Sequence, residues 1–277
     1  MIQKIEFSSD LATLYRDSEV PARAVLLYFH GGGLLFGTRR DLPDFQKAAF
    51  LSAGYPILAF DYPLAPAAHL PEILASAAES IRKYPRILMD CGLPSLPYVL
   101  WGRSAGAYLC LLLASGKWLS SPQPAGLISY YGYGFLCDNW LGEPCAYYTA
   151  LPQISREEVA PLFSQYRTEG SLEQFYSLYV YARQTGSWRS LFYDGREKYF
   201  WLDDSLRTVS QLPCPLFATH SILDPDVPWS EYQALCEHYH PAGFPVTEPE
   251  HDFDRRDTAV TRKLLSETLR FLDSLLI

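Results

Sequence analysis

The chain has 277 residues, of which 48% are hydrophobic and 19% are charged, a composition typical of a folded globular protein rather than a disordered or fibrous one. Its formal net charge of −8 argues against a nucleic-acid partner, because such a partner calls for a basic face. No apolar run is long enough to span a membrane, the N-terminus lacks the apolar core of a signal peptide, and the six cysteines form no CxxC pair. We therefore expect a cytoplasmic protein with reduced thiols.

The order of apolar runs along the chain predicts an α/β fold. The first twenty residues alternate loosely and predict a hairpin at a sheet edge. Later runs, flanked by Gly or Pro, are typical of strands buried in a parallel sheet; they are Ala24–Phe29, Ile57–Phe60, Tyr98–Trp101, Leu127–Tyr130, Leu216–Thr219 and Phe244–Thr247. Helical patterns cover Leu42–Ala53, Glu72–Tyr84, Ala105–Ser115, Trp229–Tyr239 and Asp257–Leu276. This alternation predicts a mostly parallel central sheet with helices on both faces.

One aromatic-rich segment, residues 131–212, interrupts the alternation of strands and helices. Within it, Ser155–Glu158 matches a capping box that opens a helix, and Leu172–Ala182 predicts another helix. A structureless loop of this length is improbable in a compact domain. We therefore expect a helical cap at 131–212, inserted into a core formed by residues 1–130 and 213–277.

The strongest chemical signal is the sequence Gly102-Arg-Ser104-Ala-Gly106, which follows a predicted strand and precedes a predicted helix. That context is typical of a nucleophile elbow, in which small flanking residues allow a tight turn that exposes the serine hydroxyl. A second signal, His30-Gly-Gly-Gly33, also follows a strand. Its glycines leave backbone N–H groups free to stabilise an oxyanion, whereas His30 is expected to be structural.

A serine hydroxyl needs a base, which lies after the nucleophile and the acid in the order Ser, Asp or Glu, His. Of the four histidines after Ser104, His220 precedes the acidic loop, and His238 and His240 close a predicted helix. The remaining one, His251, follows the last predicted strand and is the expected base. Asp224 and Asp226 are both candidates for the acid; we prefer Asp224, because Asp226 would otherwise cap the next helix.

These motifs together resemble the hormone-sensitive-lipase-like branch of the α/β-hydrolases, which are carboxylesterases and acetyl esterases. The resemblance also includes Asp61-Tyr-Pro-Leu-Ala-Pro66 and the tail His251-Asp-Phe253. The sequence departs from the family's usual pattern in Arg103, where an acid is frequent, and in Asp252, where glycine is usual. These differences affect the expected substrate range more than the expected mechanism.

The resemblance implies hydrolysis of small carboxylic esters through an acyl-enzyme intermediate. Ser104 would attack the ester carbonyl, His251 would accept its proton, and Asp224 would orient the imidazole. The backbones of Gly32, Gly33 and Ala105 would form the oxyanion hole.

Neither a metal nor an organic cofactor is implied, and the sequence is silent on the oligomeric state. Two alternatives remain open: an aminopeptidase or acyl transferase on the same triad, and a non-catalytic ligand-binding protein of the same fold. The aromatic segment favours a pocket for an acyl or aryl group, but it equally suits an ordinary cap core.

Overall fold

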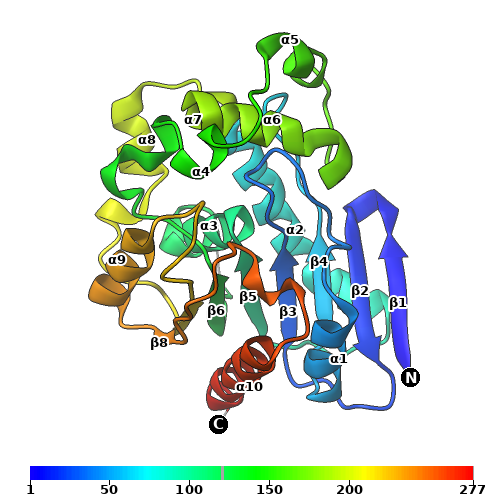
Figure 1. Ribbon diagram of the computed structural model, residues 1–277. Coiled ribbons are helices and arrows are strands. Elements are labelled where there is room, and N and C mark those ends of the chain that lie inside the picture. The colour runs from blue at the N-terminus through cyan, green and yellow to red at the C-terminus, as the bar shows by residue number, and fades with distance from the viewer. Residues whose placement is uncertain (120–121, 277) are drawn as a thin grey trace.

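The computed structural model describes residues 1–119 and 122–276, and its centre is one twisted sheet (Figure 1). Within these residues, eight strands pair in the order β1-β2-β4-β3-β5-β6-β7-β8. The strands are β1 (Ile2–Phe7), β2 (Ala12–Asp17), β3 (Val25–Phe29), β4 (Ile57–Phe60), β5 (Tyr98–Arg103), β6 (Gly126–Tyr130), β7 (Leu216–Thr219) and β8 (Ala242–Gly243). The antiparallel pair β1–β2 is the predicted edge hairpin, and β2 pairs antiparallel with β4. All other neighbours are parallel, which confirms the predicted fold class.

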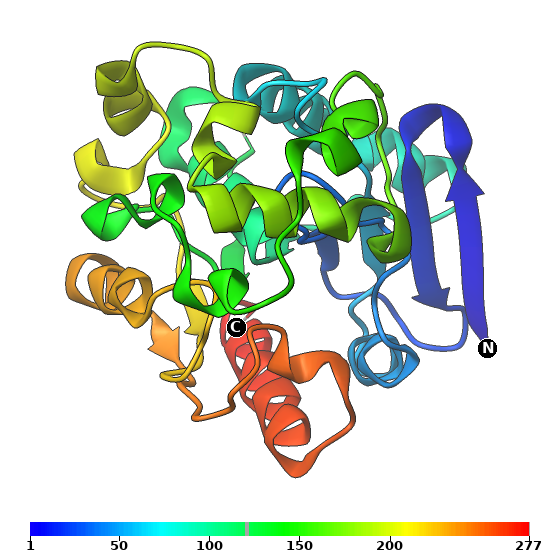
Figure 2. The same cartoon turned by 45° about the horizontal axis from the view of Figure 1, so that its top comes forward.

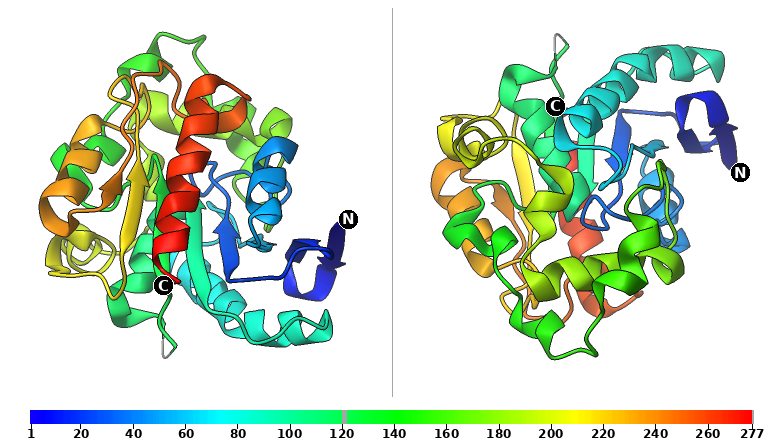
Figure 3. Two further views of the ribbon diagram at one scale, coloured as in Figure 1. Left: turned by 90° about the horizontal axis from the view of Figure 1, so that it is seen from below. Right: turned by 90° about the horizontal axis from the view of Figure 1, so that it is seen from above.

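Helices cover both faces of the sheet. They are α1 (Asp44–Ser52), α2 (Leu70–Asp90), α3 (Ala105–Leu112), α4 (Ala146–Thr149), α5 (Arg156–Val159), α6 (Leu172–Thr185), α7 (Trp188–Phe192), α8 (Glu197–Asp203), α9 (Trp229–Tyr239) and α10 (Ala259–Ser274). Helix α3 continues as a wider π turn, and 3₁₀ turns lie at Ser8–Asp10, Cys137–Gly142, Ala160–Leu162, Leu206–Thr208 and Phe253–Arg255. Figure 3, seen from below, shows α10 lying along the sheet with α1 beside it.

Two apolar cores follow from this layering. On one face, buried residues of α1 and α10 pack against Leu26, Trp101 and Ile128 of the strands. On the other face, α2 and α3 pack against Leu27 and Leu100, whose side chains point the opposite way because side chains alternate along a strand. Strands buried on both faces therefore read as continuous apolar runs, as the sequence showed.

Residues 131–212 form short helices that lie over the end of the sheet to which the parallel strands point (Figure 1). Helix α6 is the longest of them and runs across the top of the molecule (Figure 2). The predicted capping box is present: Glu158 N donates to Ser155 Oγ at 3.3 Å, and Ser155 N donates to the Glu158 carboxylate at 2.7 Å. The predicted helix at Leu172–Ala182 is confirmed and extends to Thr185.

Several predicted boundaries differ from the structure by one to three residues, and the largest differences concern the last strand and helix α2. In place of the expected strand at Phe244–Thr247, the structure has β8, which ends at Gly243, and an isolated bridge between Ser221 and Val246. Phe244 N and Val246 N still donate to Ala218 O and His220 O at 3.0 and 2.9 Å, so the proline between them faces the open edge of the sheet and costs no hydrogen bond to β7. Helix α2 does not end at Tyr84 but passes through Pro85 to Asp90. Its apolar face continues beyond the proline with buried side chains, so tertiary packing outweighs the lost hydrogen bond.

No helix in the described part of the chain has the length and apolar character needed to cross a membrane. All six cysteines lie within the described residues, and each is free.

Candidate active site

Strand β5 leads directly into a sharp turn at Ser104, and α3 begins at the next residue. Ser104 has φ 51° and ψ −120°, a strained combination for a residue with a side chain. A Cβ on Gly102 would lie 2.3 Å from Ala107 N, and a Cβ on Gly106 would lie 2.1 Å from Phe29 O. The turn therefore tolerates only glycine on either side, as the motif predicts.

The structure brings together the three residues selected as a triad from distant parts of the chain. His251 Nε2 lies 2.8 Å from Ser104 Oγ, and His251 Nδ1 lies 2.6 Å from Asp224 Oδ2. The Tyr131 ring packs edge-on against the imidazole, with centroids 4.7 Å apart. A hydroxyl, an imidazole and a carboxylate in this sequence of contacts are able to move a proton from the serine to the imidazole.

The carboxylate of Asp224 is held by its own loop as well as by His251. Its Oδ1 accepts hydrogen bonds from Asp226 N at 2.8 Å and Val227 N at 3.0 Å. Burial raises the pKa of Asp224, but the charge and hydrogen bond of His251 outweigh it, so the net pKa is lowered and the group stays ionised. Burial lowers the pKa of His251, but the adjacent Asp224 carboxylate raises it to about 9.

The second candidate acid, Asp226, makes its side-chain hydrogen bonds to residues of α6 and not to the imidazole. Tyr179 Oη donates to its two carboxylate oxygens at 2.8 and 2.9 Å, and Arg183 Nε donates to it at 3.2 Å. Asp226 does not cap α9 either, since Pro228 occupies the N-cap position. It joins α6 to the loop that carries Asp224.

The glycine loop is fixed so that two of its N–H groups have a defined direction. Gly31 O accepts a hydrogen bond from His30 Nδ1 at 2.8 Å, and Gly32 O accepts from Leu35 N at 2.9 Å. In a trans peptide the N–H points opposite to the carbonyl, so the N–H groups of Gly32 and Gly33 point away from these bonds. Within the described residues, neither these two N–H groups nor that of Ala105 has an acceptor.

The segment 131–212 is tied to this glycine loop at several points. Trp188 Nε1 donates to Gly33 O at 2.8 Å, and Gly37 and Gly170 exchange two backbone hydrogen bonds of 2.8 and 2.9 Å. The Tyr179 ring lies so close that a Cβ on Gly33 would be 2.3 Å from Cε2. The loop conformation therefore depends on the helices above it.

A cavity of about 660 Å³ opens directly beside Ser104 and His251. Most of its apolar lining is aromatic and comes from Phe36, Tyr147, Tyr148, Leu172, Tyr176 and Tyr179. Its polar lining includes Thr38, Asp41, Glu250, Asp252 and Arg255. The aromatic segment thus supplies cavity wall as well as packed core, which joins the two interpretations that the sequence left open.

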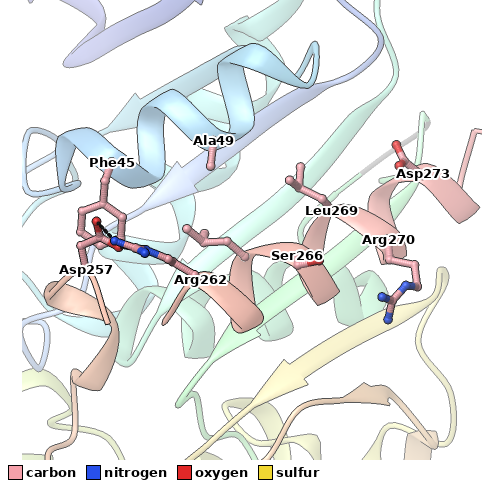
Figure 4. A pocket seen from close by; sticks show the side chains of 9 residues that line it. Phe45, Ala49, Asp257, Arg262, Ser266, Leu269, Arg270 and Asp273 are labelled. Atoms are coloured by element: carbon pink, nitrogen blue, oxygen red, sulfur yellow. Dashed lines mark hydrogen bonds and ion pairs between the residues drawn. The ribbon is translucent and has the colours of Figure 1, made fainter. Parts of the chain in front are cut away.

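A second hollow, of about 610 Å³, lies between α1 and α10 (Figure 4). Phe45, Ala49 and Leu269 line it, and the ion pair between Asp257 and Arg262 closes one end. It shares no lining residue with the cavity beside Ser104, so the two hollows are separate.

Sequence analysis missed a buried network beneath the site. Arg103 donates to Asp254 Oδ2 at 2.5 Å and to Gln46 Oε1 at 2.6 Å, and Tyr131 donates to Asp254 Oδ1 at 2.8 Å. The network links the strand before Ser104 to the loop after His251. Its signal in the sequence was Arg103 itself, because a buried arginine beside the nucleophile requires a buried acid. A second missed residue, His220, lies against Asp224.

Comparison with known proteins agrees with this architecture. Residues 26–203 match a family model described as the alpha/beta hydrolase fold. Human hormone-sensitive lipase is 33% identical over 103 residues, which cover 36% of this chain and 9% of the lipase, so the chain spans about a tenth of that relative. This match confirms the resemblance to the hormone-sensitive-lipase-like branch.

Two solved structures match over nearly the whole length of both chains. A Staphylococcus aureus subsp. aureus Mu50 protein of unknown function is 26% identical over 100% of each chain, with a TM-score of 0.82. An alpha/beta hydrolase superfamily protein from Enterococcus faecalis is 27% identical over 99% of each, with a TM-score of 0.81. With the sheet order, the turn at Ser104 and the family match in agreement, the chain belongs to the α/β-hydrolase family.

Proposed function

We propose that the protein is a carboxylesterase-type serine hydrolase that cleaves small carboxylic esters. The observation that carries the proposal is the continuous set of contacts from Ser104 Oγ through the imidazole of His251 to Asp224 Oδ2, at 2.8 and 2.6 Å. The adjoining cavity has room for a small ester and is more apolar than polar in its lining.

In the proposed reaction, Ser104 Oγ attacks the ester carbonyl while His251 Nε2 takes its proton. The resulting oxyanion accepts hydrogen bonds from the N–H groups of Gly32, Gly33 and Ala105. His251 then protonates the leaving alkoxide, and an acyl group remains on Ser104. Water, deprotonated by the same imidazole, attacks the acyl-enzyme and releases the acid. Asp224 keeps its charge throughout and stabilises the imidazolium.

We also propose that residues 131–212 act as a cap over a core of residues 1–130 and 213–277. Their helices close the cavity from above, and their contacts with the glycine loop support this role. The cytoplasmic location expected from the sequence stays a prediction.

A fluorophosphonate probe tests the proposed nucleophile. We expect one adduct, located by mass spectrometry on Ser104, and its loss in Ser104→Ala and His251→Ala. Asp224→Asn should lower kcat by about 10⁴-fold, as loss of the orienting acid does in other serine hydrolases. Asp226→Asn is the matched control, since Asp226 bonds Tyr179 and Arg183 instead, and it should lose far less activity. A folded protein that is not labelled favours the non-catalytic alternative.

A panel of p-nitrophenyl esters and aminoacyl anilides then separates the remaining alternatives. We expect hydrolysis of short acyl esters and little turnover of the anilides. Faster cleavage of the anilides would identify an aminopeptidase. Transfer of the acyl group to an added alcohol in preference to water would identify an acyl transferase.

A further inference from the structure

A second histidine contacts the carboxylate of the proposed triad. His220 follows directly after β7, four residues before Asp224, and its side chain is 1% exposed. Its Nε2 lies 3.3 Å from Asp224 Oδ2, the same oxygen that His251 Nδ1 approaches at 2.6 Å. Neither the motifs nor the family resemblance assigns a role to this contact.

The surroundings of His220 determine which ring nitrogen carries the proton. Nε2 lies 3.1 Å from Val227 O, a carbonyl that can only accept a hydrogen bond. Nδ1 is buried and has no partner among the described residues. The proton therefore resides on Nε2, where Val227 O and Asp224 Oδ2 share it, while a second proton on Nδ1 would be buried without an acceptor. Consistent with this, burial lowers the pKa of His220 despite the nearby Asp224 carboxylate.

We propose that His220 is a positioning residue, a neutral donor that fixes the Asp224 carboxylate and moderates the basicity of His251. This inference rests on the proposed function, because it assigns Asp224 the task of orienting the base. A hydrogen bond to a carboxylate withdraws negative charge from it. Asp224 then stabilises the His251 imidazolium less strongly than an otherwise identical carboxylate without this donor would.

The position of the donor gives it a geometric effect as well. Asp226 N and Val227 N hold Asp224 Oδ1, whereas His220 and His251 approach Oδ2. Both oxygens are therefore fixed, and the carboxylate is kept from rotating about its last bond. Without His220, the loop would still hold Oδ1, but Oδ2 would be held by His251 alone, the group that the carboxylate has to orient.

Other groups near the pair also influence its titration. Asp226 and Asp252 both raise the pKa of His251 through their charges, and Tyr131 packs on its ring. The ring centroids of Trp229 and Tyr232 of α9 lie 6.0 and 6.2 Å from that of the His220 imidazole. A substitution at residue 220 leaves all of these groups in place, so the change in titration reports on the donor.

The test compares His220→Leu, which keeps the volume without the donor, with His220→Gln, which carries an N–H at a similar distance from its Cα. In ¹⁵N-histidine-labelled protein, we expect wild-type His220 to show a protonated Nε2 and an unprotonated Nδ1. The pKa of His251, followed by the same NMR spectra, should rise in His220→Leu and return towards the wild-type value in His220→Gln. His238→Gln, a change at an exposed histidine of α9, is the matched control and should leave it unchanged.

The kinetic measurement follows the same variants. In His220→Leu, kcat/KM at pH 7 should fall about tenfold, and its pH profile should shift to higher pH. A profile that matches the wild type, equal impairment of His220→Gln and His220→Leu, or a proton on Nδ1 of wild-type His220 would each overturn the proposal. If His220→Leu does not fold, the wild-type tautomer and the His220→Gln titration decide the question.

The NMR titration needs no substrate and separates the two proposals. A protein that hydrolyses no ester but shows the expected titration would contradict the esterase function and retain the role of His220 as a donor. An active esterase in which the pKa of His251 is unchanged by His220→Leu would support the esterase function and contradict the role of His220.

Discussion

The imidazole of His251 lies between one carboxylate and one hydroxyl, and under the proposed function this placement sets the pH at which the enzyme works. Asp224 raises the pKa of His251 to about 9, against the opposing effect of burial. An imidazolium cannot accept the serine proton, so kcat/KM should rise about tenfold per pH unit and level off only near pH 9. Rates of p-nitrophenyl butyrate hydrolysis between pH 5 and 10, corrected for the spontaneous reaction, test this; a plateau already at pH 6 would contradict it.

The same raised pKa affects stability in the opposite direction. Because the pKa of folded His251 exceeds its ordinary value of 6.5, the protonated imidazole stabilises the folded state. That contribution is complete below about pH 6.5 and disappears as the pH rises through about 9. The protein should therefore lose some stability in the pH range where it gains activity.

Gly106 gives a second prediction for a single residue. In Gly106→Ala, the new Cβ would lie 2.1 Å from Phe29 O and 2.4 Å from His30 O, both of them rigid backbone atoms. Since the turn must shift, we expect Ser104 and the proposed oxyanion donors to move apart and kcat/KM to fall by about 10² or more. Gly92→Ala is the control, because nothing lies within 4 Å of its added Cβ. Full activity in Gly106→Ala would show that the turn has more freedom than the structure allows.

The sequence revealed those residues of the candidate site whose motif is confined to a few neighbouring positions or whose place follows from chain order. Ser104 and the glycine loop were recognisable because the requirement for small residues is local to a turn. His251 and Asp224 followed from their order after strands. The contact of His220 with Asp224 and that of Arg103 with Asp254 depend on which loops meet in space. A single sequence does not contain that information.

Among the structural elements, α9 holds the segment that follows β6 in place through hydrogen bonds to one of its side chains. Glu231 is fully buried and accepts four hydrogen bonds, from the backbone N–H groups of Gly134, Phe135 and Cys137 and from Trp140 Nε1, at 2.6–3.0 Å. In Glu231→Gln, an amide NH₂ would replace one acceptor oxygen and face N–H donors. The free energy of unfolding should fall by about 3 kcal/mol.

Urea unfolding of Glu231→Gln, compared with Glu237→Gln, measures this effect. Glu237 lies on the exposed side of the same helix, so the control makes the same chemical change without losing buried bonds. Equal urea midpoints for the two variants would mean that the hydrogen bonds of Glu231 contribute little to stability.

The ends of helices and strands are harder to predict from the sequence than their presence. Strands Ile57–Phe60 and Leu216–Thr219 and helix Trp229–Tyr239 were predicted to the residue. Pro85 did not end α2, and Pro245 did not stop its neighbours Phe244 and Val246 from donating to Ala218 O and His220 O, although β8 itself ends at Gly243. In α2, packing of the following helix turn outweighs one missing hydrogen bond, whereas at the sheet edge Pro245 faces away from β7 and no such bond is lost.

For the whole molecule, the parallel sheet was predictable because its apolar runs are continuous, whereas the fold of residues 131–212 was not. Only the capping box and the helix now seen as α6 were recognised there. The remaining helices are short, from four to seven residues, and take their stability from the core beneath them rather than from their own sequence.

This dependence predicts a single cooperative unfolding transition. Tyr133, Trp188 and Phe200 of the segment share one apolar cluster with Leu34 and Tyr108 below it. Tryptophan fluorescence, to which the segment contributes three of the chain's six tryptophans, should therefore change together with far-UV circular dichroism on heating. An earlier fluorescence transition would instead show that the segment unfolds by itself.

The ties between Gly37 and Gly170 and between Trp188 and Gly33 have a consequence for turnover. If residues 131–212 moved away from the sheet as a rigid lid to admit substrate, these bonds would break. The glycine loop would then lose its conformation just when substrate binds. We therefore expect molecules to enter and leave past Tyr147 and Leu172, whose half-exposed side chains border the cavity. For the proposed esterase, we expect the width of that gap, rather than a hinge, to select which esters reach Ser104 and how fast the product acid leaves.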